Sequence, residues 1–226
     1  MGLSIGTSNV FLDNTLRGSK EYLMRAMGID VSTKTGVAII DGEEVTKPVI
    51  VFTHEIESPA SKGMRRADVI ASKIMEYVHH YQPDMIYLED YAFMFKSSGI
   101  VSMEIGTAIR FLLYKDGYDY QNVSNSSIKK FVTGNGKAQK DLMLKEVYKR
   151  WGFDTNSDNI ADAVGIAMFA LAVKDLVQMP RVNLDPVDKF KDSLLAEQAK
   201  ELAKVTKVIK KVTKTVEKKQ LIAKTV

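Results

Sequence analysis

The chain contains no cysteine and only three histidines among its 226 residues. Disulfide bonds, thiolate zinc sites and cysteine nucleophiles are therefore excluded, and any bound metal must be held by oxygen ligands or by those histidines. No apolar run approaches the roughly 20 residues that a membrane-spanning helix requires. The first residues lack the apolar core of a secretory signal peptide, so we expect the protein in the cytoplasm.

Composition is that of a globular protein, with 45% hydrophobic and 27% charged residues. This balance excludes wholesale disorder, and the length allows one full-sized domain with appendages. The formal net charge of +4 is unevenly placed: residues 181–226 hold 12 Lys and Arg against 6 Asp and Glu, and residues 1–180 hold 20 against 22. The basic part of the chain is therefore its tail.

Hydrophobic periodicity predicts elements in the order β-β-β-α-β-α-β-α-α. The predicted strands are residues 27–31, 37–41, 49–57, 85–89 and 118–123, and the predicted helices are 61–81, 101–115, 138–151 and 159–179. Residues 1–25 show no periodicity and form an N-terminal arm. Pro180 and Pro186 are expected to break the chain before a Lys-rich amphipathic helical tail. The predicted organisation is an arm (1–25), a domain (26–179) and a tail (180–226).

Three acidic residues lie in apolar surroundings on separate elements. Asp30 ends the first strand, Glu89 ends the fourth, and Asp162 lies in a helix of small apolar residues. Ionised acids inside a core are costly unless compensated, and three that converge would suit divalent cations such as Mg²⁺ or Mn²⁺. A carboxylate cluster that binds two such ions is the device for phosphodiester hydrolysis.

Asp30, Glu89 and the nearby Asp158 also have a purely structural interpretation. Asp30 could accept hydrogen bonds in the turn that follows its strand, and Glu89 could supply polarity at a sheet edge. Asp158 is most simply the N-cap of the last core helix. The joint occurrence of Asp30, Glu89 and Asp162 in this order of elements favours a site.

The segment 128–140 has the features of a phosphate-binding region. Gly134 and Gly136 permit close backbone approach, and a helix begins just after them. The positive charges that could contact nucleic-acid phosphates are Lys129, Lys130, Lys137 and Lys140. The lysine density makes this more than a simple turn.

These residues resemble the RuvC family of Holliday-junction resolvases, within the RNase H-like superfold. The resemblance rests on Gly28-Ile29-Asp30, Leu88-Glu89-Asp90, Phe93 to Lys96, Lys129 to Lys140 and Ala161-Asp162-Ala163, and covers residues 26–179. It implies an α/β fold, with a mixed five-stranded sheet flanked by helices. The extra arm and basic helical tail are similar to the elaborations of phage-encoded members, in which case the cytoplasm would be that of the host.

The resemblance also implies roles for individual residues. Asp30, Glu89 and Asp162 would be catalytic and would hold two Mg²⁺ ions, with Mn²⁺ able to substitute. Lys140 would join them, and with Lys129 would contact DNA near the scissile phosphate. The remaining expected DNA contacts are Lys130, Lys137 and an aromatic wedge in the junction, either Phe93 or Tyr91. The fourth metal ligand stays open between Asp158 and Asn159, because the chain lacks the family's usual acid there.

The sequence therefore predicts a metal-dependent endonuclease that cuts Holliday junctions and other branched DNA in recombination and repair, acting as a homodimer. Two alternatives remain open: a catalytically silent branched-DNA-binding protein, and another RNase H-like nuclease acting on hybrids or flaps. The tail's heptad-spaced apolar residues could serve dimer contacts, the DNA backbone or both. We expect no contact with a membrane.

Overall fold

The computed structural model describes residues 23–43, 47–59, 61–91 and 97–223. Its sheet has five strands in the order β3-β2-β1-β4-β5. They are β1 (Met24–Asp30), β2 (Lys34–Gly42), β3 (Val49–Glu57), β4 (Met85–Glu89) and β5 (Gln121–Val123). β1 pairs antiparallel with β2 and parallel with β4, which confirms the predicted mixed sheet.

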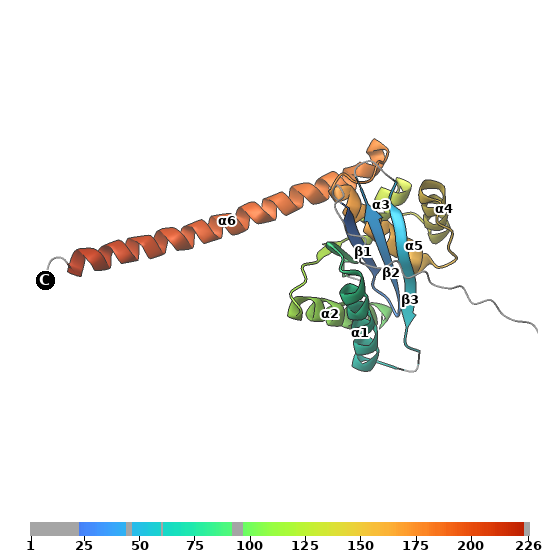
Figure 1. Cartoon of the computed structure of the whole chain (residues 1–226), viewed down its shortest axis with the longest axis horizontal. Coiled ribbons are helices and arrows are strands. Elements are labelled where there is room, and N and C mark those ends of the chain that lie inside the picture. The colour runs from blue at the N-terminus through green and yellow to red at the C-terminus, as the bar shows by residue number, and fades with distance from the viewer. Residues whose placement is uncertain (1–22, 44–46, 60, 92–96, 224–226) are drawn as a thin grey trace, which may run out of the picture.

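Helices cover both faces of the sheet (Figure 1). One face carries α1 (Met64–Tyr81) and α2 (Ser97–Lys115), and the other carries α3 (Asn125–Thr133), α4 (Lys140–Trp151), α5 (Asp158–Val173) and the start of α6 (Arg181–Ala223). Central strand β1 contributes to both cores, since Ala26 packs on the α5 side while Met27 and Ile29 pack on the α1 side. A strand buried on both faces has a continuous apolar run, which explains why the sequence revealed it clearly.

Helix α5 crosses β1 and β2 at backbone contact distance. A Cβ atom at Gly28 would lie 2.2 Å from the carbonyl oxygen of Ala163, and one at Gly36 would lie 2.0 Å from that of Asn159. Any side chain at either glycine would push the helix off the sheet, so these positions require glycine. Because Gly36 pairs with Asp30, the first turns of α5 lie over the end of β1.

The structure contains a helix that the sequence did not predict. Helix α3 occupies Asn125–Thr133, and only the loop at 133–136 was expected in this region. Its N-cap is Ser124, whose Oγ accepts a hydrogen bond from the Ser127 amide at 3.2 Å, and its C-cap is Gly134 at φ 81°. Nine residues are too few to establish a periodic pattern, although both capping residues were visible in the sequence.

Several element boundaries also differ from the prediction. Strand β5 is three residues long, and α4 begins at Lys140, two residues later than expected. Helix α5 ends at Val173, six residues early, because Asp175 adopts φ 61° in the following turn. Strand β1 begins at Met24, inside the predicted N-terminal arm, and residues 1–22 of that arm lie outside the described residues.

The predicted break at Pro186 is wrong, because α6 runs continuously from Arg181 through this proline. The first part of α6, residues 181–194, is here called the α6 root. Val187 in the root is buried, and the Asn183 side chain donates a 2.6 Å hydrogen bond to the carbonyl oxygen of Phe131. The Phe190 ring packs against Tyr87. The predicted domain boundary at residue 180 thus excludes a helical segment that packs into the core.

Residues 195–223 of α6, here called the α6 extension, project away from the sheet and its helices (Figure 1). At 1.5 Å per residue, the 43 residues of α6 span about 65 Å. A basic helical tail was expected, and the extension confirms its helical form. Within the described residues, no helix has the length and apolar character needed to cross a bilayer.

Candidate carboxylate active site

Parallel pairing of β1 with β4 brings Asp30 next to Glu89. Ile29 is in register with Leu88, so the residues that follow them end neighbouring strands at the same edge of the sheet. The Asp30 side chain is buried, at 5% exposed, and shares a hydrogen bond with Glu89. Burial and then the charge of Glu89 raise the pKa of Asp30 well above its usual range. A protonated Asp30 can donate to Glu89, whereas two ionised carboxylates here would repel each other.

Helix α5 adds two more acids to this region. Burial and the charge of Glu89 raise the pKa of Asp162 to about 6, against the opposing effect of Lys129 and Lys140. The charges of Asp162 and Asp158 also raise the pKa of Asp30, after the larger effects of burial and Glu89. The structure therefore brings together the three acids selected from the sequence, with Asp158 as a fourth.

The donor chemistry of these acids fits a hard divalent cation, since carboxylate oxygens are the ligands that Mg²⁺ and Mn²⁺ prefer. A cation would remove the repulsion that raises the pKa values of Asp30 and Asp162. Across the described residues, however, no three acidic or histidine side chains already surround a common point. The direct contact is between Asp30 and Glu89, and the charges of the other two acids raise the pKa of Asp30.

Asp158 is not the N-cap of α5, contrary to the simplest interpretation of the sequence. The cap is Ser157, whose Oγ accepts a hydrogen bond from the Ile160 amide at 3.2 Å. Asp158 is the first helical residue and forms an ion pair with Lys140. The hydrogen bond from Lys140 lowers the pKa of Asp158, so this carboxylate stays ionised.

Asn159 faces a different partner from the acids. Its side-chain nitrogen donates to Glu55 Oε2 of β3 at 3.0 Å, and the Ser157 hydroxyl donates to the same carboxylate. These bonds lower the pKa of Glu55, with Ser157 as the largest cause. Glu55 therefore anchors the start of α5 to the sheet, and Asn159 takes part in that anchor.

Two further side chains hold Glu89 and Tyr91 in place. Asn125, the first residue of α3, donates to Glu89 Oε1 at 2.6 Å. Buried Arg110 of α2 donates to the Glu89 carbonyl oxygen at 2.7 Å, and its guanidinium lies 4.2 Å from the ring centre of Tyr91. The Tyr91 hydroxyl lies 3.3 Å from that of Thr107. The ring proposed as one candidate wedge is thus packed against α2.

The four lysines selected from the sequence lie in three different surroundings. Lys129 and Lys140 are close enough to the carboxylates to lower the pKa of Asp162. Lys137 is exposed in the loop before α4, where its amide donates to Asn135 Oδ1 at 3.0 Å. Lys130 instead forms an ion pair with Asp185 of the α6 root. Phe93, the other candidate wedge, lies outside the described residues.

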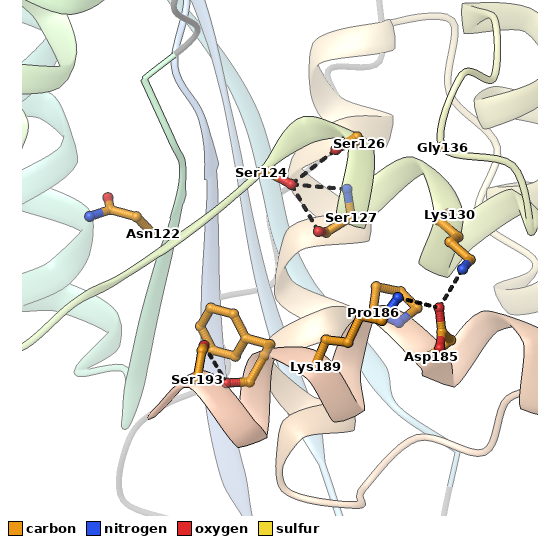
Figure 2. Close-up of a pocket in the computed structure, with 11 residues that line it drawn as sticks. Asn122, Ser124, Ser126, Ser127, Lys130, Gly136, Asp185, Pro186, Lys189 and Ser193 are labelled. Carbon is orange, nitrogen blue, oxygen red and sulfur yellow. Dashed lines mark hydrogen bonds and ion pairs between the residues drawn. The ribbon is translucent and has the colours of Figure 1, made fainter. Parts of the chain in front are cut away.

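A pocket of about 490 Å³ is lined by residues of both α3 and the α6 root, and none of the four acids lines it. Figure 2 shows the Ser124 hydroxyl bonded within the first turn of α3, and Asp185 between Lys130 and Lys189. The pocket is a separate feature from the carboxylate region. Its side chains show that the α6 root engages one of the lysines expected to contact DNA.

Sequence reasoning missed Asn125, Arg110 and Glu55. Each lies far along the chain from the residue that it positions: Asn125 is 36 residues from Glu89, and Glu55 is 104 residues from Asn159. Polar residues at such positions have many possible exposed roles, and only the packing of β3, α2 and α3 reveals these contacts. The one local signal was Ser124, a preferred N-cap residue that would have placed Asn125 in the first turn of a helix.

The strand order, the mixed pairing and the helices on both faces define an RNase H-like fold. Residues 26–170 match the family model described as "Crossover junction endodeoxyribonuclease RuvC", and the chain belongs to this family. This confirms the resemblance seen in the sequence. The similarity to phage-encoded members stays a prediction.

Curated relatives with the same name occur in several bacteria. The protein from Rickettsia conorii is 34% identical over 116 residues, which cover 49% of this chain and 72% of the relative. That from Brachyspira hyodysenteriae is 29% identical over 148 residues, which cover 64% and 92%. Among solved structures, RuvC of Thermus thermophilus aligns with a TM-score of 0.58 at 20% identity, over 68% of this chain and 98% of that one. Its complex with a Holliday junction substrate aligns with a TM-score of 0.57 at 20% identity, covering 64% and 91%.

Proposed function

We propose that this chain is an endodeoxyribonuclease that hydrolyses phosphodiester bonds in Holliday junctions and other branched DNA. The observation that carries the proposal is the buried Asp30 carboxyl in contact with Glu89, with the charges of Asp158 and Asp162 acting on it. Carboxyl groups held together in this way lower the stability of the protein unless a cation neutralises them, so a functional role is the simplest explanation for the cluster. Clusters of this kind commonly bind the metal ions of phosphoryl-transfer enzymes. The name shared by its relatives and the junction-bound Thermus thermophilus structure support the same activity.

Asp30, Glu89 and Asp162 would hold two Mg²⁺ ions, with Mn²⁺ able to substitute. Asp158 is the better candidate for the fourth ligand, because it is ionised and acts on Asp30, whereas the Asn159 amide is bonded to Glu55. When bound, the ions would supply an activated water nucleophile and stabilise the leaving oxygen. Asn125 would keep Glu89 oriented toward this site.

Lys129 and Lys140 would neutralise a phosphate beside the carboxylates, and Lys140 would share its charge between that phosphate and Asp158. Lys137 would contact a neighbouring phosphate of the DNA backbone. Lys130 would have to break its ion pair with Asp185 before it could bind a phosphate. An aromatic wedge would come from Phe93 or Tyr91. A four-way junction has two strands to cut symmetrically, so the active form would be a homodimer. We place this activity in the cytoplasm.

The test is cleavage of four matched substrates: a four-way junction, a flap, an RNA-DNA hybrid and a linear duplex. Each is incubated with Mg²⁺, with Mn²⁺ and with EDTA. We expect metal-dependent cutting that is fastest on the four-way junction. Binding without cutting in either metal would indicate a silent junction-binding protein, and preferred cutting of the hybrid or flap would indicate a different RNase H-like nuclease.

A further inference from the structure

The α6 extension carries an apolar stripe that nothing in the described structure covers. Its residues are between 47% and 68% exposed: Leu195, Leu202, Val205, Val208, Ile209 and Val212. Leu202, Val205, Ile209 and Val212 are spaced by three, four and three residues, the pattern of positions a and d in a heptad, and Val208 lies beside them at g. The family match ends at residue 170, so the extension lies outside the part shared with the family model.

The stripe continues a face of α6 that the domain already buries. Val205 lies 18 residues after Val187, and 18 residues make five full turns of an α-helix. Both side chains therefore point along the same line of the helix, but Val187 is 1% exposed and Val205 is 47% exposed. Leu194 and Val212 are also 18 residues apart and therefore lie on one line of the helix as well. The domain covers this face along the root and leaves it uncovered along the extension.

Lysines are absent from the positions that flank the stripe. With Leu202 and Ile209 at a, the e and g positions between 199 and 215 hold alanine, threonine, valine and one glutamate, Glu201. Lys200, Lys204, Lys207 and Lys210 fall at b, c or f, on the opposite face, here called the basic face, and Lys211 and Lys214 continue these register positions in the sequence. Lys219 falls at d, so the stripe ends before it. Two such helices can therefore pair along the stripe without bringing lysines together.

We propose that the apolar stripe of the α6 extension pairs with the same stripe of a second copy of this chain. The e and g positions, which are neutral apart from Glu201, match each other, whereas an acidic partner helix would find no lysine there to pair with. DNA would meet the basic face and leave the stripe exposed. The seam from Leu195 to Val216 has one polar d position, Gln198, and would span about 33 Å. The packed root supplies the first turns that a short isolated helix must nucleate alone.

Single cysteines test the pairing directly, because the full-length chain contains no other thiol. The seam variants are Leu202→Cys, Val205→Cys, Ile209→Cys and Val212→Cys. The matched variants on the opposite face are Lys204→Cys, Lys207→Cys and Lys210→Cys. Each purified protein is oxidised mildly, and the fraction migrating at twice 25.3 kDa is measured without reductant.

We expect crosslinking at seam positions and little on the basic face. Parallel helices would crosslink at all four seam sites, and antiparallel helices only near their crossing point; either result supports pairing. Adding Ile209→Lys to Val205→Cys should reduce the crosslinked fraction at least tenfold, while adding Lys207→Ala should not, with helix content checked by circular dichroism. Equal crosslinking on both faces, or none on the seam, would overturn the proposal. The assay requires no nuclease activity, so it is independent of the proposed function.

Discussion

Lys140, the first residue of α4, forms an ion pair with Asp158, the first residue of α5. The lysine side chain is 75% exposed and the aspartate 30%, so the pair contributes at most about 1 kcal/mol to stability. The ion pair matters more for where it holds these two residues and for the charge of Asp158 than for stability. The pair keeps Asp158 ionised and joins the lysine-rich segment to the helix that bears Asp162.

Asp158→Asn should raise the Mg²⁺ concentration needed for cleavage, because it removes one negative oxygen ligand. Its stability should change by less than about 1 kcal/mol, since the ion pair that it removes is partly exposed. The control is Ser157→Ala, which removes both the N-cap and the hydrogen bond to Glu55 and should cost about 1 to 3 kcal/mol, while leaving the Mg²⁺ requirement unchanged. Metal titrations and urea melts measure both properties. An unchanged Mg²⁺ requirement in Asp158→Asn would remove it from the ligand set.

Asp30→Asn, Glu89→Gln and Asp162→Asn should each abolish cleavage of a four-way junction. Junction binding should persist, since we expect lysines rather than carboxylates to contact the phosphates, and lower negative charge should even strengthen binding without metal. Asp90→Asn is the matched control beside Glu89. Gel cleavage and binding assays on the same preparations separate the two functions. A variant that cuts at the unmutated rate would not be a site residue.

The raised pKa of Asp162 predicts that this group's contribution to the stability of the metal-free protein falls as the pH rises. Its folded pKa is about 6 and its reference value is 3.8, so between them the folded state binds more protons than the unfolded state. Stability from this group is therefore full below about pH 4 and is lost by about pH 6, by up to roughly 3 kcal/mol.

Asp162→Asn removes this titration and is the matched comparison. In EDTA, the free energy of unfolding of the unmutated protein relative to the variant should fall across that pH range. Mg²⁺ should restore stability at neutral pH only where the carboxylate is present. A difference between the two proteins that does not change with pH would contradict the raised pKa of the buried Asp162.

Asn125→Ala should reduce cleavage or metal affinity by about 10- to 100-fold, the effect typical of residues that orient a metal ligand. We expect this loss because the Glu89 carboxylate would no longer be held in one orientation by Asn125. Ser126→Ala, at the next and exposed position, is the control and should behave like the unmutated protein. If Asn125 acts through Glu89, a saturating Mg²⁺ concentration should recover part of the activity. Loss of folding in both variants would instead show a structural role in α3.

Asp30, Glu89 and Asp162 could be found from the sequence because each breaks an apolar run, and such a break has few explanations. The central strands could be predicted because buried strands contain long apolar runs. Helix α3 and the contacts of Asn125 and Glu55 could not, because they depend on which distant elements pack together. The position of Lys130 against Asp185 likewise required the α6 root, which the sequence assigned to a separate tail.

Truncation experiments on the tail should stop after Leu194 rather than after Pro180. Residues 181–194 carry three basic and three acidic side chains, so both truncations remove the same net charge of +6. Stopping after Pro180 would also remove buried Val187 and the Asn183 hydrogen bond to Phe131, and should lower the melting temperature.

Stopping after Leu194 should leave the melting temperature of the domain unchanged, because residues 195–210 of the extension are exposed and project away from the sheet and its helices (Figure 1). If lysines of the extension bind phosphates, the slope of log affinity for a junction against log salt should flatten by about 0.9 for each phosphate that is no longer neutralised. Binding measured across a range of salt concentrations gives this slope, and exchanging Lys207 and Lys210 for glutamine in the full chain should reproduce part of the change. An unchanged slope in both proteins would show that the basic face does not bind DNA. The lysines would then serve to keep the outer face of the helix hydrated.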